Sequence, residues 1–505
     1  MNYNNWLYKR ERYTPQKEAV VDTTTGRRHT YADLNRQANA LASVLQSTYN
    51  LGAGDRLAVI SKNNVPYMML FFACAKIGVI LVPLNYRLPS AGLKALLSDC
   101  NPHLVAYSTE YEEFVRSQVD PENTSVLPIK KGDQSIAALM QTEQQPPVIH
   151  QAKADDIAMI LYTSGTTGRS KGAMISWRQI HWNSLNTGLS LQLTGSDSTF
   201  VNTPFYHTGG WHVMLTPLIH RGGTLIFQPE FDAAGCNRLI EEESISILFG
   251  IPTMLRMMME QPNFEDADFS SLRFTICGGE SCPIPLINRF KEKGVPIRQG
   301  YGLTEAGPNC YSLPAEDAIR KKGSVGFPNF HIGTKIVDDN NLQVTQGEVG
   351  ELLMKGPHVF EGYWKMPEAT TKTIEDGWVH TGDLFRRDEE GYYYMVGRKK
   401  EMYISGGENV YPVQVEKVIY GHPAVAQAAI IGVPDERWGE TGCAYVVLNA
   451  NKSLTAEELK AYCREYLAAY QCPKHIVFKD DLPVGDSNKI QKRDLEDEYQ
   501  RIYAN

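Results

Sequence analysis

Short apolar runs alternate with longer, more polar stretches along most of the 505-residue chain. Four of these apolar runs have the length of a β-strand: 56–61, 157–162, 224–227 and 245–249. The segments between them have the length and spacing of helices. Continuous apolar strands are typical of sheets that are buried on both faces. The pattern therefore predicts an α/β protein with layers of sheets and helices.

The longest apolar run covers residues 68–84 and is interrupted by Lys76, Gly78 and Pro83. A membrane-spanning helix needs about 18 or more apolar residues without such interruptions. We therefore predict no membrane span here. The run is better explained as a buried helix followed by a strand.

The pattern changes near residue 397, where a tyrosine-rich strand at 392–396 leads directly into a charged segment that begins at Arg398. The remaining residues are enough for a small α+β domain. Its predicted strands and helix lie at 426–432, 443–448 and 455–467. We predict a large N-terminal domain, 1–397, and a C-terminal domain, 398–505, with a hinge near Lys400.

Composition excludes several classes of protein. The chain is 42% hydrophobic, which argues against disorder as its main state. Its 58 acidic and 50 basic side chains give a net charge of −8, so the whole surface has no basic character for binding nucleic acid. The first residues do not resemble a secretory signal. The nine cysteines include no C-x-x-C pair, which favours reduced thiols and a cytoplasmic location.

The most informative motif is a segment rich in glycine and hydroxyl groups that follows the predicted strand 157–162. Glycines let backbone N–H groups turn toward an anion, hydroxyl groups donate further hydrogen bonds, and Lys171 adds a positive charge. The segment therefore predicts a phosphate-binding loop. It is not a Walker A loop, because Lys171 is followed by Gly172. Nor do Gly300 and Gly302 begin a Rossmann fingerprint, because Glu305 occupies the third glycine position.

This loop resembles the signature of the adenylate-forming superfamily, which includes acyl-CoA synthetases. Further motifs of that family follow in the expected order: 204–207, 301–305, 381–383, 397–398 with 405–409, and 488–490. The resemblance covers nearly the whole chain. It implies a large adenylate-forming domain followed by a small, mobile C-terminal domain. It also implies a ligase that uses ATP and Mg²⁺ to form an acyl-adenylate and pyrophosphate, and then transfers the acyl group to the thiol of coenzyme A (CoA) with release of AMP.

The resemblance also implies roles for particular residues. The mobile Lys489 would bridge the carboxylate and the α-phosphate during adenylation, and Thr304 would contact the α-phosphate. Glu305 and Thr163 are expected at the metal, and His207 resembles an aromatic gate between the nucleotide and the acid. The residues expected to bind ATP or CoA are Thr163, Ser164, Gly165, Thr166, Thr167, Gly168, Lys171, Gly279, Glu280, Tyr301, Gly302, Asp383, Arg398, Gly407, Trp438, Tyr470 and Lys474.

CoA is the expected acyl acceptor because the chain has no fused carrier domain. Trp438, Tyr470 and Lys474 match a CoA-ligase pattern, and Gly407 would line the pantetheine tunnel. Cys472 departs from that pattern, because an arginine is frequent at its position.

The acid is not defined by these motifs. We expect the acyl pocket to be lined by Trp211, His212, Met214 and residues 249–252, which suit a medium-chain or long-chain fatty acid, or an aryl acid. Two alternatives stay open: an acyl-AMP ligase that loads a carrier protein, and a catalytically silent nucleotide-binding scaffold. A homodimer also stays open.

Overall fold

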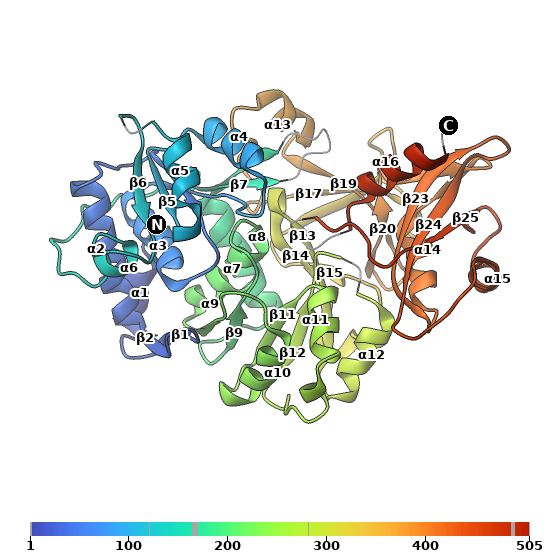
Figure 1. Ribbon diagram of the computed structural model, residues 1–505, viewed down its shortest axis with the longest axis horizontal. Helices are drawn as coiled ribbons and strands as arrows, with labels where there is room; N and C mark the ends of the chain where they lie inside the picture. The colour runs from blue at the N-terminus through green and yellow to red at the C-terminus, as the bar shows by residue number, and fades with distance from the viewer. Residues whose placement is uncertain (1–2, 121, 164–169, 281, 486–489, 504–505) are drawn as a thin grey trace.

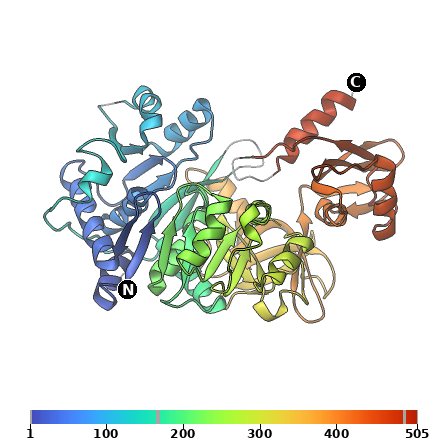
Figure 2. The same cartoon turned by 60° about the horizontal axis from the view of Figure 1, so that its bottom comes forward.

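Figure 1 shows the computed structural model, which describes residues 3–120, 122–163, 170–280, 282–485 and 490–503. Within these ranges the strands form four sheets, three before Arg398 and one after it. Figure 2 shows the last sheet and its helices set beside the rest of the molecule. The predicted α/β class is confirmed, with a large N-terminal part and a smaller C-terminal part.

The largest sheet has nine strands among the described residues, and its central strands are parallel. In spatial order they are β15 (Phe327–Pro328), β14 (Gly307–Ser312), β13 (Ile297–Leu303), β12 (Phe274–Cys277), β11 (Ile247–Gly250), β9 (Ser198–Val201), β10 (Thr224–Phe227), β1 (Glu18–Asp22) and β2 (Arg27–Thr30). Because β9, β11, β12 and β13 are parallel, the segments that follow them leave the sheet at the same edge. This edge receives several of the predicted site residues.

A second sheet positions the predicted phosphate loop. Its strands, in spatial order, are β6 (Ser125–Pro128), β5 (Leu104–Tyr107), β3 (Arg56–Ile60), β4 (Ile80–Pro83), β7 (Ile157–Thr163) and β8 (Lys171–Ser176). All neighbouring pairs are parallel except β7 and β8, which form an antiparallel pair at the sheet edge.

The third sheet is antiparallel and leads to the C-terminal part. It contains β16 (Gly333–Val337), β17 (Gly350–Lys355), β18 (Ile374–Glu375), β19 (Trp378–Arg387) and β20 (Tyr393–Arg398). β20 pairs with β19, so the chain leaves this sheet at Arg398.

Most of the helices before Arg398 cover the first two sheets, whereas the last of them packs against β18 and β19 of the third sheet (Figure 1). They are α1 (Trp6–Tyr13), α2 (Tyr31–Ser47), α3 (Val65–Ile77), α4 (Ser90–Cys100), α5 (Glu112–Gln118), α6 (Ile136–Leu139), α7 (Trp177–Ser190), α8 (Thr208–His212), α9 (Leu215–Arg221), α10 (Ala233–Glu242), α11 (Pro252–Met259), α12 (Ile284–Glu292) and α13 (Pro367–Thr373). Short 3-10 helices are η1 (Thr109–Tyr111), η2 (Pro262–Phe264), η3 (Thr304–Ala306) and η4 (Ala315–Asp317).

The apolar run 68–84 forms the C-terminal part of α3 and then β4, as predicted. All residues of α3 are buried, and Asn64 caps its start by accepting a hydrogen bond from the Tyr67 N–H. Gly78 ends the helix in the left-handed conformation, with φ +79°. Among the residues that the structure describes, no helix is both long and apolar enough to cross a membrane.

The C-terminal part has its own apolar core between a sheet and helices, which includes Val415, Ile430 and Leu459. Its elements are β21 (Tyr403–Ser405), β22 (Glu408–Val410), α14 (Pro412–Tyr420), β23 (Val425–Asp435), β24 (Gly439–Leu448), α15 (Ala456–Tyr466), β25 (His475–Phe478) and α16 (Lys492–Tyr503). The helix predicted at 455–467 is α15, which Thr455 caps. This arrangement is the predicted α+β type.

Candidate active site

The β7–β8 pair brings together the two ends of the predicted phosphate loop. Thr163 and Lys171 are paired across it, and the Thr163 hydroxyl donates a hydrogen bond to the Lys171 carbonyl at 3.4 Å. Five residues predicted to bind ATP lie outside the described residues: Ser164, Gly165, Thr166, Thr167 and Gly168.

Thr304 and Glu305 form η3, directly after β13. The Gln179 side chain on α7 donates to the Thr304 carbonyl at 2.9 Å, and the Phe360 N–H donates to the Glu305 carbonyl at 2.9 Å. Both backbone groups are therefore fixed from neighbouring segments. Sequence reasoning did not identify Gln179 or Phe360, because neither lies in one of the motifs.

Tyr363 links two of the predicted residues. Its hydroxyl donates to Glu305 Oε1 at 2.7 Å, and the Lys171 ammonium lies 4.8 Å from its ring centroid. Burial raises the pKa of Glu305, whereas the Tyr363 hydrogen bond and the Lys171 charge act in the opposite direction. A divalent cation would compensate the charge of this carboxylate, and its oxygen atoms are the ligands that Mg²⁺ prefers. The side chain therefore fits the predicted metal.

Tyr301, Asp383 and Arg398, all predicted to bind the nucleotide, lie together. The Tyr301 hydroxyl donates to Asp383 Oδ2 at 2.7 Å, and Arg398 Nε lies 3.5 Å from Asp383 Oδ1. Burial and the neighbouring carboxylate raise the pKa of Tyr301, so its hydroxyl stays protonated and donates. Asp383 and Arg398 are also paired across β19 and β20. The structure thus joins a motif on the first sheet to two motifs on the third.

Glu351 supports the turn before Asp383, although sequence reasoning did not identify it. Its carboxylate accepts a hydrogen bond from the Gly382 N–H at 3.1 Å and lies 3.3 Å from the Lys399 ammonium. Glu351 therefore connects β17 both to the Asp383 turn and to the segment after Arg398.

Gly279 and Glu280 follow β12 and are exposed. Since β12 and β13 are parallel, this segment leaves the sheet at the same edge as η3. Gly302 has a structural reason to lack a side chain, because a Cβ there would lie 2.3 Å from the Pro308 backbone. The prediction that Gly302 lies beside the nucleotide is compatible with this tight packing against the Pro308 backbone.

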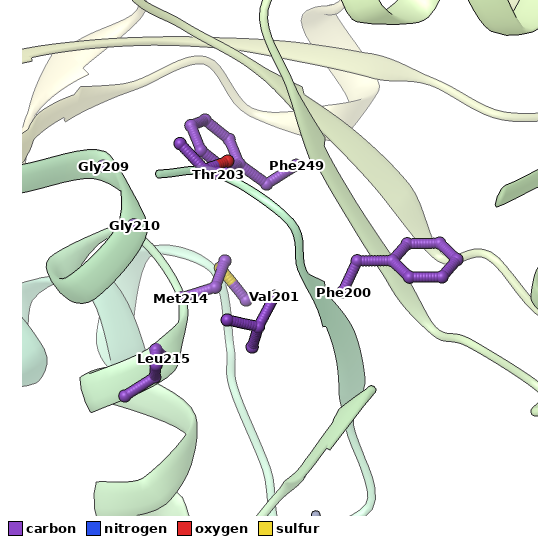
Figure 3. Close-up of a pocket in the computed structure, with 8 residues that line it drawn as sticks. All are labelled: Phe200, Val201, Thr203, Gly209, Gly210, Met214, Leu215 and Phe249. Carbon is purple, nitrogen blue, oxygen red and sulfur yellow. The ribbon is translucent and has the colours of Figure 1, made fainter. Parts of the chain in front are cut away.

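A pocket opens beside the segment that follows β9. It is lined by Phe200, Val201, Thr203, Gly209, Gly210, Met214, Leu215 and Phe249. Figure 3 shows Val201, Met214 and Leu215 near the helix that contains Gly209 and Gly210. The space open to a water-sized sphere is only about 10 Å³, which holds about one water molecule. His207 precedes α8 and is not among the residues that line this pocket; its ring lies 4.5 Å from that of Tyr206.

Five of the seven residues expected in the acyl pocket, Trp211, His212 and residues 250–252, are not among those that line this pocket. Trp211 is fully buried, its ring stacks on Phe205 at 4.0 Å, and its Nε1–H donates to the Phe205 carbonyl. His212 is also buried and lines a separate, smaller pocket beside Asn183. Of the expected residues, Met214 and Phe249 line this pocket.

The residues predicted to contact CoA lie in the C-terminal part. Trp438 is 37% exposed, and the Arg437 guanidinium lies 5.1 Å from its ring. Lys474 Nζ lies 2.5 Å from Asp435 Oδ2, and this bond lowers the pKa of Asp435. Tyr470 packs against the C-terminal core.

Gly407 has φ +85°, and no atom of the described residues lies within 4 Å of a Cβ built there, leaving out its two chain neighbours. At Gly406 a Cβ would lie 2.5 Å from the Trp438 ring. The two glycines therefore differ. Gly406 leaves room for the Trp438 ring, whereas a Cβ at Gly407 would meet none of the described residues, its chain neighbours aside.

The predicted hinge lies between β20 and β21. Burial and the neighbouring Arg398 lower the pKa of Lys400. Glu401 connects this segment to the C-terminal helix through an ion pair with Lys492 at 3.1 Å, and Lys492 pairs with Glu416 on α14 at 2.7 Å. The predicted mobile Lys489 lies outside the described residues.

Comparisons with known proteins agree with this geometry. The profile of the AMP-binding enzyme family matches residues 7–364, and that of the AMP-binding enzyme C-terminal domain matches residues 414–489. Feruloyl-CoA synthase of an Amycolatopsis species is 36% identical over 97% of this chain and 98% of its own. A long-chain-fatty-acid–CoA ligase of Mycobacterium tuberculosis is 35% identical over 98% of this chain and 97% of its own.

The fold is similar to that of MatB from Rhodopseudomonas palustris, which is 30% identical and matches over the full length of both chains. The TM-score is 0.93 with the ATP-bound form and 0.82 with the apo form. The chain is a member of the AMP-binding enzyme family, the adenylate-forming superfamily that its motifs resemble.

Proposed function

We propose that the chain is an ATP-dependent carboxylic acid–CoA ligase. It forms an acyl-adenylate and pyrophosphate, and then transfers the acyl group to the CoA thiol with release of AMP. The observation that supports this best is the Tyr301–Asp383–Arg398 cluster, which joins motifs 82 residues apart through a 2.7 Å hydrogen bond. Adenylation needs a fixed nucleotide, and this cluster offers a carboxylate and a cation at one point.

On the nucleotide side, Asp383 accepts hydrogen bonds from the ribose hydroxyls, since a carboxylate only accepts. Lys171 and the N–H groups of the phosphate loop bind the phosphates, and Thr304 contacts the α-phosphate. Glu305, with Thr163, holds Mg²⁺, which when bound neutralises phosphate charge. Gly279, Glu280 and Gly302 lie beside the base.

The acid is an aryl or fatty acid that binds at the pocket between α8 and β11, which must widen from the space of about one water molecule to admit it. Its wall is apolar apart from Thr203, so no cation faces a second carboxylate among the residues that line it. The names of the two relatives describe a feruloyl and a long-chain fatty acid substrate. His207 separates this pocket from the nucleotide. We place the enzyme in the cytoplasm, where its nine cysteines, all unpaired, stay reduced.

The C-terminal domain, 398–505, turns about a hinge near Lys400 between the two half-reactions. Lys489 serves adenylation. After the turn, Gly407 lies along the pantetheine tunnel, and Trp438, Tyr470 and Lys474 contact CoA. This turn agrees with the open space beside Gly407 and with the Lys474–Asp435 pair, which must open before Lys474 binds a phosphate.

A pyrophosphate-release screen over fatty and aryl acids, with and without CoA, tests the proposal. We expect release with at least one acid, and CoA-dependent formation of AMP and thioester with the same acid. Adenylate without CoA-dependent AMP release would instead indicate an acyl-AMP ligase that loads a carrier protein. Nucleotide binding without turnover of any acid would indicate a scaffold.

A further inference from the structure

Tyr363 stands between two residues that reach it from different sheets. Lys171 begins β8 in the second sheet, and Glu305 follows β13 in the first. The Tyr363 ring faces the ammonium group at 4.8 Å, within the range of a cation–π contact. Its hydroxyl donates to the Glu305 carboxylate at 2.7 Å. One side chain therefore contacts a cation with its ring and an anion with its hydroxyl.

The backbone around Tyr363 is held against β8. The Met174 N–H donates to the Gly362 carbonyl at 2.9 Å, and the Trp364 N–H donates to the Gly172 carbonyl at 2.7 Å. The Tyr363 N–H itself donates to Thr370 Oγ1 at 2.9 Å. These bonds fix the Tyr363 backbone relative to the strand that Lys171 begins.

Two glycines allow this close approach. Gly362 has φ +119°, and a Cβ there would lie 2.5 Å from the Thr370 side chain. A Cβ at Gly172 would lie 3.3 Å from the Trp364 side chain, as well as 2.8 Å from Ile160. The Phe360 N–H also donates to the Glu305 carbonyl at 2.9 Å, so the segment 360–364 contacts both the backbone and the side chain of Glu305.

We propose that Tyr363 is a positioning residue that sets the Glu305 carboxylate through its hydroxyl and the Lys171 ammonium through its ring. The proposal rests on the functions proposed above for Glu305 and Lys171. A carboxylate that is already oriented loses less freedom when it binds a metal with ATP, so the hydroxyl affects metal-dependent ATP binding above all. The ring affects ATP binding whether or not a metal is present.

The test compares Tyr363→Phe, which keeps the ring, with Tyr363→Leu, which removes both contacts. ATP binding is measured by calorimetry in MgCl₂ and in EDTA. For Tyr363→Phe we expect affinity to fall about 5- to 30-fold in MgCl₂ and by less than about twofold in EDTA. Tyr363→Leu should weaken binding in both. In steady-state assays, Tyr363→Phe should raise the KM for MgATP more than it lowers kcat.

Tyr394→Phe is the matched control, because the Tyr394 hydroxyl also donates to a carboxylate, Asp388 Oδ2 at 3.2 Å. It should leave ATP binding unchanged in both buffers. If Tyr363→Leu does not fold, Tyr363→Phe alone decides, since it removes a single oxygen atom.

Glu305→Gln separates this proposal from the proposed function. If Glu305→Gln loses metal-dependent binding while Tyr363→Phe binds like the wild type, or weakens equally in both buffers, the positioning role is wrong and the ligase proposal stands. If Glu305→Gln also binds like the wild type, the metal role of Glu305 fails and the Tyr363 proposal fails with it. A wild-type protein that binds no ATP in either buffer overturns both.

Discussion

The nucleotide side and the CoA side of the proposed site differ in how their polar groups are arranged. On the nucleotide side, Tyr301 and Tyr363 donate hydrogen bonds to Asp383 and Glu305 and so keep these carboxylates in place. On the CoA side, Lys474 is paired with Asp435 within the C-terminal part, and Gly407 faces open space.

This difference indicates which half-reaction the structure is ready for. Oriented groups stabilise developing charge without rearranging, whereas groups that are paired elsewhere must first exchange partners. The fold as a whole is also more similar to that of ATP-bound MatB, with a TM-score of 0.93, than to that of the apo form, with 0.82. We therefore propose that the described arrangement serves adenylation and that thioester formation requires Lys474 to change partner.

The largest effect should come from Lys489→Ala. Removing a cation that stabilises charge in the transition state typically costs about 10²- to 10³-fold in rate. We expect that loss in carboxylate-dependent ATP–pyrophosphate exchange. Thioester formation from a supplied acyl-adenylate should stay within about threefold of the wild type, since that step does not use the cation.

Lys452→Ala is the control, because Lys452 is an exposed lysine in the same domain. It should leave both half-reactions unchanged. Normal exchange in Lys489→Ala would show that adenylation does not depend on this lysine. The proposed functional difference between the nucleotide side and the CoA side would then lose its main support.

The next largest effect should follow from Asp383→Asn. The amide removes the charge beside Arg398 and replaces an acceptor with a donor, which should lower kcat/KM for ATP about 10- to 100-fold. Tyr301→Phe removes only the donor to Asp383 and should cost about three- to tenfold. Steady-state kinetics with varied ATP measure both. Equal values for the two variants would contradict a direct ribose contact by Asp383.

The sequence indicates candidate residues for the nucleotide side but not the contacts between them. Motif order placed Asp383, Tyr301 and Glu305 in one site, because each lies in a recognisable pattern. Tyr363 was missed although it contacts Glu305, since the two residues are 58 positions apart and the contact depends on how two sheets meet. No local pattern contains that information.

For the acyl pocket, the sequence predicts residues that do not line the pocket beside β9. Trp211 is expected at the acyl pocket because aromatic residues often line pockets, but it is packed on Phe205 in the core and does not line the pocket beside β9. Apolar spacing predicts burial and does not distinguish a core position from a pocket wall. The α/β class and the boundaries of α15 were predictable, because they depend on local periodicity and on the Thr455 cap.

On the CoA side, Gly407→Leu should affect mainly thioester formation. In this arrangement a Cβ at Gly407 meets none of the described residues, its chain neighbours aside, so adenylation should stay within about twofold, apart from a folding cost of about 1–2 kcal/mol for positive φ. In the tunnel it would obstruct pantetheine, and transfer from a supplied acyl-adenylate to CoA should fall about tenfold.

Gly54→Leu controls for the backbone cost, because Gly54 has φ +87° and likewise no atom of the described residues within 4 Å of a built Cβ, its chain neighbours aside. Both variants should lose similar stability in thermal unfolding, and only Gly407→Leu should separate the half-reactions. Equal loss of both half-reactions in Gly407→Leu would point to misfolding and remove Gly407 from the CoA side.

The smallest effect should come from Arg256→Ala, which acts on the contact between the two domains. The Arg256 guanidinium on α11 donates to the Ala426 carbonyl of the C-terminal part and lies 6.0 Å from the Tyr420 ring. A hydrogen bond from a charged donor is worth about 1.5–3 kcal/mol when buried and less at a partly exposed surface. Losing this contact should shift the equilibrium by about two- to fivefold toward the arrangement with the C-terminal domain turned.

The sign of this change makes it informative. If the described arrangement serves adenylation, Arg256→Ala should slow pyrophosphate exchange and speed transfer to CoA from a supplied acyl-adenylate, both by a few-fold. Arg238→Ala on the neighbouring helix α10 removes an arginine that, among the described residues, forms an ion pair with Glu242 of its own helix, and should change neither rate. A change of both rates in the same direction would mean that the Arg256 contact stabilises the fold and does not select between the two sides.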